Sequence, residues 1–176
     1  RQATTPELPL IDGRTSATQP KHLSFAKAAA LPLTSITAWE LLFDRLGAVP
    51  GKSNDPRTLL ITGGAGGVGS ILIQLARRLT GLTVLATATR PESQKWCLDL
   101  GAHAVIDHGK AMKEQIEKLK LPPVGLVASL TYTDQHYKAI AEFMAPQGKF
   151  GLIDDPPEFT VSAFKGKAIS VHWESM

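Results

Sequence analysis

One stretch, residues 58–79, restricts the fold of this chain more than any other part of the sequence. It starts with the short apolar run Leu59-Leu60-Ile61, which is typical of a strand buried in a parallel sheet. The glycine-rich segment Gly63-Gly-Ala-Gly-Gly-Val-Gly69 follows directly, and after it apolar residues recur at the spacing of one helix face. The sequence therefore predicts a buried strand, a tight turn and a helix, in that order.

The glycines of this turn match the dinucleotide-binding pattern Gly64-x-Gly66-x-x-Gly69. In that pattern the first glycine permits the tight turn, the second lets the backbone approach a pyrophosphate, and the third lets the helix pack on the strand. The unpaired N–H groups at the start of the helix face the phosphates. We therefore expect Ala65 to permit close approach of a pyrophosphate, and backbone N–H groups to be offered to it by Gly66, Gly67 and Val68.

Composition and charge exclude several other classes of protein. The net charge of +3 is small, and the sequence contains no block of Lys or Arg residues, which argues against a nucleic-acid partner. A single cysteine, Cys97, excludes an internal disulfide framework, and the five histidines show no metal-ligand spacing, so we expect no zinc site. No apolar run is long enough to span a bilayer and no signal-peptide pattern occurs, so we expect a cytoplasmic protein with no membrane partner.

Short strands and helices alternate from Thr58 onward. Strands are expected at 58–61, 82–86, 104–107, 124–129, 149–153 and 168–173, and helices at 68–79, 91–100, 110–119 and 134–144. Alternating strands and helices with right-handed crossovers form a parallel sheet that is covered on both faces. The predicted fold class is therefore α/β: a doubly wound parallel sheet, or Rossmann fold, with about six strands in the order 3-2-1-4-5-6.

The N-terminal part of the chain has a different pattern. Residues 1–22 are rich in Thr and Pro, and their apolar patch at residues 8–11 fits either an edge strand or a tail from another domain. Ser24 is a suitable N-cap for a helix that starts at Phe25 and that Pro32 interrupts. A second helix is expected at 35–46, with Ile36, Trp39, Leu42, Phe43 and Leu46 on its apolar face. Trp96 is likewise expected in the core.

The end of the second predicted strand indicates which dinucleotide is bound. An enzyme that uses NAD places Asp or Glu there, where the carboxylate binds the ribose 2′-hydroxyl. This chain instead reads Thr87-Ala-Thr-Arg90, with no acid before Glu92. The Thr89 hydroxyl and the Arg90 guanidinium suit a 2′-phosphate, which arginine can hold through two hydrogen bonds. The predicted cofactor is therefore NADP(H).

Four motifs make the chain resemble the medium-chain dehydrogenase/reductase superfamily, in particular its quinone oxidoreductases and zinc-type alcohol dehydrogenase-like proteins. They are Ala28-Ala-Ala-Leu-Pro-Leu-Thr-Ser-Ile-Thr-Ala-Trp-Glu40, Gly63-Gly-Ala-Gly-Gly-Val-Gly-Ser70, Leu100-Gly-Ala-His-Ala-Val-Ile-Asp107 and Ala145-Pro-Gln-Gly-Lys149. The resemblance implies that residues 23–176 form an NADP(H)-binding domain and that residues 1–22 are the tail of an absent GroES-like catalytic domain. It further implies hydride transfer from NADPH to a quinone, an enone or an aldehyde. We expect this chain to be inactive alone, and the resemblance leaves a homodimer open.

The resemblance and the fold together assign the remaining site residues. By resemblance, Thr37 faces the nicotinamide or its phosphate, Ser93 stands where related quinone reductases carry a lysine, and His108 replaces a tyrosine beside the adenine ribose and the 2′-phosphate. Ligands of doubly wound sheets bind at the carboxyl ends of the strands. The residues that we expect to line the cleft at the fourth and fifth strands are therefore Ser129, Thr131, Leu152 and Ile153.

Three other classes of protein share parts of this pattern. The turn also fits short-chain dehydrogenases, but the Tyr-x-x-x-Lys pair of that class is absent, because Tyr132 precedes His136 and Tyr137 precedes Ala141 at that spacing. A methyltransferase would also need an acid after the second strand. A non-enzymatic NADP(H)-sensing module of the same fold stays open, because fold alone does not determine function. No residue stands out as a catalytic acid or base, and hydride transfer from a cofactor requires none.

Overall fold

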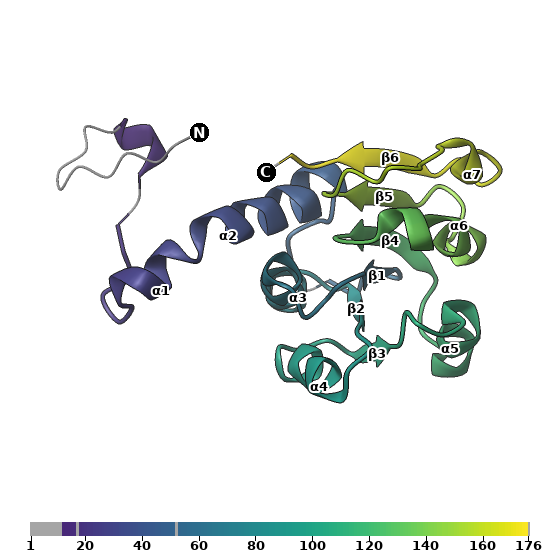
Figure 1. Ribbon diagram of the computed structural model, residues 1–176, viewed down its shortest axis with the longest axis horizontal. Coiled ribbons are helices and arrows are strands. Elements are labelled where there is room, and N and C mark those ends of the chain that lie inside the picture. The colour runs from purple at the N-terminus through teal and green to yellow at the C-terminus, as the bar shows by residue number, and fades with distance from the viewer. Residues whose placement is uncertain (1–11, 17, 52, 176) are drawn as a thin grey trace. The chain divides into compact units, whose positions relative to one another are not determined.

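The computed structural model describes residues 12–16, 18–51 and 53–175 (Figure 1). Its backbone contacts divide the chain into two compact units, one up to Pro32 and one from Leu33 onward. This division lies ten residues after the boundary predicted at 22/23, because the helix at Phe25–Ala29 groups with the residues before it. The expected edge strand or tail at 8–11 lies outside the described residues.

The first unit contains a short 3₁₀ turn, η1 (Gly13–Thr15), and one helix, α1 (Phe25–Ala29). The Ser24 hydroxyl accepts the N–H of Lys27 at 3.4 Å, which confirms the predicted N-cap. A separate helix, α2 (Pro32–Trp39), starts at the proline that was expected to interrupt the first one. Proline is well placed there, since the first residue of a helix needs no N–H for a helical bond.

The second unit is built on one six-stranded sheet in the order β3-β2-β1-β4-β5-β6, with every neighbouring pair parallel. The strands are β1 (Thr58–Ile61), β2 (Thr83–Thr87), β3 (Ala104–Ile106), β4 (Val124–Ser129), β5 (Lys149–Leu152) and β6 (Ser170–Trp173). The predicted strand order and Rossmann fold are thus confirmed. The order reverses between β1 and β4, and such switch points are where doubly wound sheets bind ligands.

Helices cover both faces of the sheet (Figure 1). They are α3 (Gly67–Leu79), α4 (Pro91–Asp99), α5 (Met112–Leu119), α6 (Thr133–Phe143) and α7 (Ser162–Lys165), the last of which was not predicted. One apolar core joins one sheet face to α3 and α4, and a second joins the other face to α5, α6 and α7. Cys97 is fully buried in the first core, as a structural thiol should be.

The segment after α2 departs from the predicted amphipathic helix. It continues as a π-helical turn, η2 (Glu40–Arg45), which shifts the phase of the side chains relative to a regular helix. Leu42 and Leu46 are buried as predicted, whereas Ile36 and Trp39 are 56% and 47% exposed. The expectation that Trp39 and Trp96 lie in the core was wrong, since Trp96 is half exposed and its indole N–H donates to the Ser70 hydroxyl at 2.9 Å.

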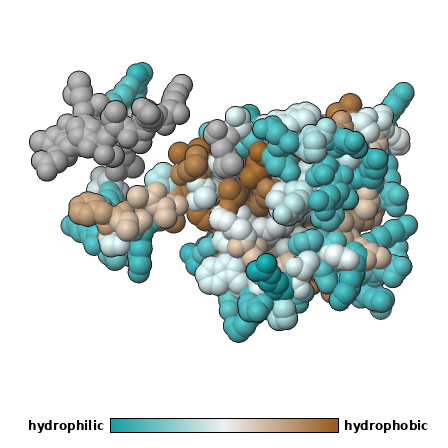
Figure 2. Space-filling model, in the orientation of Figure 1, coloured by the Kyte–Doolittle hydropathy of each residue, from teal (hydrophilic) through white to brown (hydrophobic). Residues whose placement is uncertain are grey.

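Figure 2 shows hydrophobic residues gathered over α2, while hydrophilic residues cover much of the visible face of the second unit. Within the described residues, none of the helices combines the length and the apolar character that a bilayer crossing demands.

Candidate functional site

The glycine turn between β1 and α3 is tied to the end of β2 by hydrogen bonds. The N–H of Gly64 donates to the Thr87 carbonyl at 3.2 Å, and the N–H of Gly63 donates to the Thr87 hydroxyl at 3.3 Å. Gly63 has a φ of +64°, so it is this glycine, rather than the predicted Gly64, that permits the tight turn.

Close packing explains the other glycines of the turn. A Cβ on Gly69 would lie 2.6 Å from the Gly63 carbonyl oxygen and 2.7 Å from that of Gly64, and a Cβ on Gly64 would lie 2.8 Å from the Cβ of Ala86. Helix α3 can therefore begin close to the sheet only because these positions have no side chain. This arrangement directs the first N–H groups of α3 toward the space above the turn.

One of the three predicted amide donors needs correction. The N–H of Gly66 donates to the Gly63 carbonyl at 3.0 Å within the turn, so this group is already engaged. Gly67 and Val68 are the first residues of α3, where no preceding helical carbonyl can accept their N–H groups. The structure therefore leaves Gly67 and Val68 as the amide groups for an anion, with Gly66 contributing close approach.

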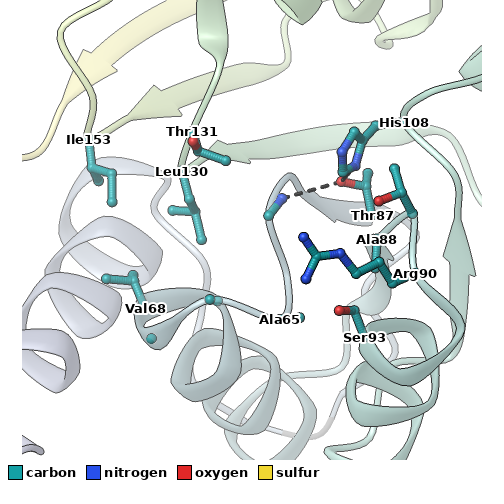
Figure 3. Close-up of a pocket in the computed structure, with 15 residues that line it drawn as sticks. Ala65, Val68, Thr87, Ala88, Arg90, Ser93, His108, Leu130, Thr131 and Ile153 are labelled. Carbon is teal, nitrogen blue, oxygen red and sulfur yellow. Dashed lines mark hydrogen bonds between the residues drawn. The ribbon is translucent and has the colours of Figure 1, made fainter.

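A cavity of about 460 Å³ lies over this turn, at the carboxyl ends of the strands (Figure 3). A volume of this size falls within the range of pockets for small-molecule ligands. The residues that line it are Gly63, Ala65, Gly66, Gly67, Val68, Gly69, Thr87, Ala88, Thr89, Arg90, Ser93, His108, Leu130, Thr131 and Ile153.

Polar side chains gather at one end of the cavity, where Figure 3 shows Arg90, Ser93 and His108 around the end of β2. Nδ1 of His108 lies 3.0 Å from the Thr87 hydroxyl, which in turn accepts the N–H of Gly63. Of the described residues that line the cavity, none carries a carboxylate. This end therefore presents cationic and hydrogen-bonding groups to a ligand and no negative charge.

The opposite end of the cavity is apolar. Val68 at the start of α3, Leu130 after β4 and Ile153 after β5 converge there in Figure 3, with Thr131 beside Leu130. An elongated ligand in this cavity would thus meet a cationic end, a glycine turn with helix amides, and an apolar end.

Ten of the thirteen residues predicted for the site line the cavity: Ala65, Gly66, Gly67, Val68, Thr89, Arg90, Ser93, His108, Thr131 and Ile153. The other three do not, because their side chains are buried in the protein. Thr37 is 2% exposed and its hydroxyl donates to the Leu33 carbonyl, Ser129 is fully buried among other hydroxyls, and Leu152 belongs to the core.

Sequence reasoning did not select Thr87 or Ala88 for the site, although both line the cavity. Thr87 ends β2 and Ala88 follows it, so the rule that ligands meet the carboxyl ends of strands could have found them. Leu130, which lies within the predicted stretch 129–131 after the fourth strand, lines the cavity as well.

The glycine turn, the sheet and the cavity can be compared with those of known proteins. The family model described as Zinc-binding dehydrogenase matches residues 67–171, which include helix α3 and most of the cavity. The chain belongs to the zinc-binding dehydrogenase family. This places it in the medium-chain dehydrogenase/reductase superfamily, as the sequence motifs predicted.

Individual relatives agree with this family. The zinc-type alcohol dehydrogenase-like protein SAS2087 of Staphylococcus aureus is 34% identical over 179 residues, covering 100% of this chain and 53% of its own length. A putative zinc-dependent alcohol dehydrogenase from Rhizobium etli, solved by crystallography, is 55% identical with a TM-score of 0.82, covering 89% of this chain and 46% of that one. The NADPH-dependent alkenal/one oxidoreductase of Arabidopsis thaliana chloroplasts is 36% identical over 113 residues, 64% of this chain and 27% of its own. The present chain thus spans about half the length of the first two proteins.

The family description raises the question of a metal site. Across the described parts of the chain, no cluster of three or more His, Cys, Asp or Glu side chains could hold a metal ion. Cys97 is fully buried in the apolar core, and burial raises the pKa of its thiol, so it stays protonated and does not fit a metal ligand. The described residues therefore do not fit zinc, whereas the glycine turn and the first amides of α3 fit a nicotinamide dinucleotide.

Proposed function

We propose that this chain is the NADP(H)-binding part of an oxidoreductase that transfers hydride from NADPH to an enone or a quinone. The observation that carries the proposal is the polar end of the cavity, which holds the Arg90 guanidinium and no carboxylate among its described residues. NAD-binding sites of this fold use an Asp or Glu at the end of the second strand to bind the ribose hydroxyls. A dianionic 2′-phosphate instead favours a guanidinium and hydroxyl donors.

The rest of the cavity accommodates the remaining parts of such a cofactor. The amides of Gly67 and Val68 and the positive end of α3 would hold the pyrophosphate above the glycine turn. Val68, Leu130 and Ile153 would then enclose the nicotinamide at the apolar end. When bound, NADPH supplies the hydride, and these residues bind it, orient it and exclude water.

The acceptor is proposed from chemistry and from relatives. Hydride is a nucleophile, so it adds to an electron-poor carbon such as the β-carbon of an enone or a ring carbon of a quinone. The Arabidopsis relative is named as an NADPH-dependent alkenal/one oxidoreductase, which supports this class of acceptor. We propose in the same way that an aldehyde can also serve as the acceptor and that the reaction does not require zinc. We further propose that this chain is inactive by itself.

Three further assignments remain proposals too. We infer that residues 23–176 act as the cofactor domain, that residues 1–22 adjoin a GroES-like catalytic domain, and that the protein works in the cytoplasm. Since the polypeptide corresponds to about half of its curated relatives, these assignments concern the longer protein.

A titration with both nucleotides tests the cofactor assignment. Arg90→Ala should weaken NADPH binding by about 1.5–3 kcal/mol, the usual value of a hydrogen bond to a charged group. That corresponds to roughly tenfold to a hundredfold in Kd, with little change for NADH. Arg78→Ala, which removes a cation from the exposed far end of α3, is the matched control and should bind NADPH like the wild type. Equal affinities of the wild type for NADH and NADPH would refute the assignment.

Activity of the longer protein decides between an enzyme and the sensing module. The proposal expects oxidation of NADPH with at least one member of a panel of quinones and enones. Tight NADPH binding with no turnover on any of them would favour the non-enzymatic NADP(H) sensor.

A further inference from the structure

A chain of buried hydroxyl groups crosses the sheet where β1 and β4 end. Thr62, Ser129 and Thr133 are each no more than 1% exposed. The Thr62 hydroxyl donates to that of Ser129 at 3.5 Å, and the Ser129 and Thr133 hydroxyl oxygens lie 2.7 Å apart. The Thr133 hydroxyl donates to Asp154, which follows β5 by two residues.

The hydrogen bonds between these buried hydroxyl groups all run in one direction. An ionised carboxylate can only accept, so the Thr133 hydroxyl must use its single proton on Asp154. Ser129 must then donate to Thr133, and Thr62 to Ser129. At the other end, the N–H of Leu130 donates to the Thr62 oxygen at 3.0 Å. Each group is therefore satisfied only when its neighbour is oriented correctly.

The hydroxyl chain lies where the two walls of the cavity separate. Gly63, Leu130 and Ile153 line the cavity, and they are the direct sequence neighbours of Thr62, Ser129 and Asp154. Beyond β1 and β4 the polypeptide turns toward opposite faces of the sheet, because the strand order reverses there. Backbone bonds continue as far as Thr62 N–H to Ala128 and Ile153 N–H to Ser129. The side-chain hydroxyls extend this connection to the two walls themselves.

We propose that Thr133 and Asp154 are positioning residues for the dinucleotide site, although neither lines the cavity. They orient the hydroxyl chain, which holds the Gly63 turn and the Leu130 wall at the separation that the cofactor requires. This inference rests on the proposed function for its ligand, but the positioning itself is a property of the unliganded chain.

A matched pair at Thr133 tests the proposal. Thr133→Val has almost the same shape and keeps the backbone N–H that donates to Asp154 at 3.0 Å, but it loses the hydroxyl. Thr133→Ser keeps the hydroxyl. We expect T133V to weaken NADPH binding about fivefold or more, which is within the range for residues that act on a site indirectly, and T133S to stay within about twofold of wild type. Asp154→Asn, whose amide would donate where the carboxylate accepts, should weaken binding at least as much as T133V.

A control variant separates positioning from stability. Ile140→Val removes one buried methylene from the same helix without touching the hydroxyl chain. It should lower thermal stability and leave NADPH affinity unchanged. If T133V binds NADPH like the wild type, or if I140V weakens binding equally, the inference is overturned.

Amide hydrogen exchange on the unliganded chain provides a second readout. Peptides that cover residues 62–67 and 129–133 should exchange faster in T133V than in the wild type, T133S or I140V. Unchanged exchange would refute the positioning role. If T133V shows this faster exchange but the wild-type chain binds no dinucleotide, the proposed function alone is refuted.

Discussion

At the scale of single residues, the glycines of this chain differ in what a side chain at each position would meet. The hydrogen of Gly69 faces two carbonyl oxygens of the glycine turn, and backbone atoms cannot move aside like the end of a flexible side chain. Gly166 faces open space at the end of α7 and has helical dihedral angles. The first glycine is therefore required by packing, and the second is not.

Replacing each of these two glycines by alanine tests this difference. Gly69→Ala should lower the free energy of unfolding by about 1–3 kcal/mol, the usual cost of overpacking, and should also weaken dinucleotide binding because the turn must shift. Gly166→Ala should be neutral or stabilise the chain by up to about 1 kcal/mol. Urea denaturation monitored by circular dichroism measures both. A Gly69→Ala chain as stable as Gly166→Ala would contradict the packing argument.

Residue type and position predicted most of the cavity but not its hydrogen bonds. Arg90, Ser93 and His108 could be placed from the strand ends and the family resemblance, and all three line the cavity. The engagement of Gly66 could not be predicted, because it depends on the carbonyl orientation that follows from the positive φ of Gly63.

At the scale of elements, helix α6 packs a titratable side chain beside the cavity. The His136 ring on α6 lies 5.4 Å from the His108 ring, centroid to centroid. Burial lowers the pKa of His136, the charge of His108 lowers it further, and Asp134 partly opposes this. The folded chain therefore favours neutral His136 more than the unfolded chain does.

This pKa difference predicts a dependence of stability on pH. As the pH falls, His136 becomes protonated near pH 6.5 in the unfolded chain but only at a lower pH in the folded chain. The contribution of neutral His136 to the free energy of unfolding is therefore present above that pH, and it is lost as the pH falls through the lower pKa of the folded chain. Between pH 7 and pH 5, wild type should lose more free energy of unfolding than His136→Gln. His103 and His172, whose pKa values are also lowered, and Glu174, whose pKa is raised, are common to both proteins. Parallel stability curves would refute this prediction.

Elements with regular periodicity were predicted well, and irregular ones were not. Helix α6 buries Tyr137, Ile140 and Ala141, and its C-cap residue Met144 is buried too, as the sequence pattern indicates. The π-helical turn η2 was missed because apolar spacing assumes a regular helix, whereas a π-helical turn contains an added residue. This turn packs against the sheet at Gly151 of β5, where a Cβ would lie 2.6 Å from the Leu41 side chain, so the glycine makes room for it.

At the scale of the whole molecule, the unit from Leu33 onward contains all the described residues that line the cavity. The cavity residues lie between Gly63 and Ile153, and both buried apolar clusters lie between Ala38 and Ile169. A compact unit with its own core can fold by itself.

A truncated chain of residues 32–176 tests this independence. It should unfold cooperatively, with a free energy of unfolding within about 1 kcal/mol of the full chain, since the deletion removes no residue of either core. Its NADPH affinity should stay within about twofold, a change of less than about 0.5 kcal/mol, because the truncated chain keeps all the described residues that line the cavity. Thermal denaturation and fluorescence titration measure these two quantities. Loss of cooperative unfolding would show that residues 1–31 are part of the folding unit.

The sequence by itself determined the parallel sheet, its strand order, the glycine turn and the missing acid after β2, because these follow from local periodicity and residue type. Only the tertiary structure decided which side chains reach the cavity. Thr37, Ser129 and Leu152 follow the predicted pattern yet point into the protein. The hydroxyl chain from Thr62 to Asp154 likewise joins residues that are distant in sequence. Such contacts depend on how three strand ends approach one another, and that approach is set by the packing of the whole sheet rather than by any local signal.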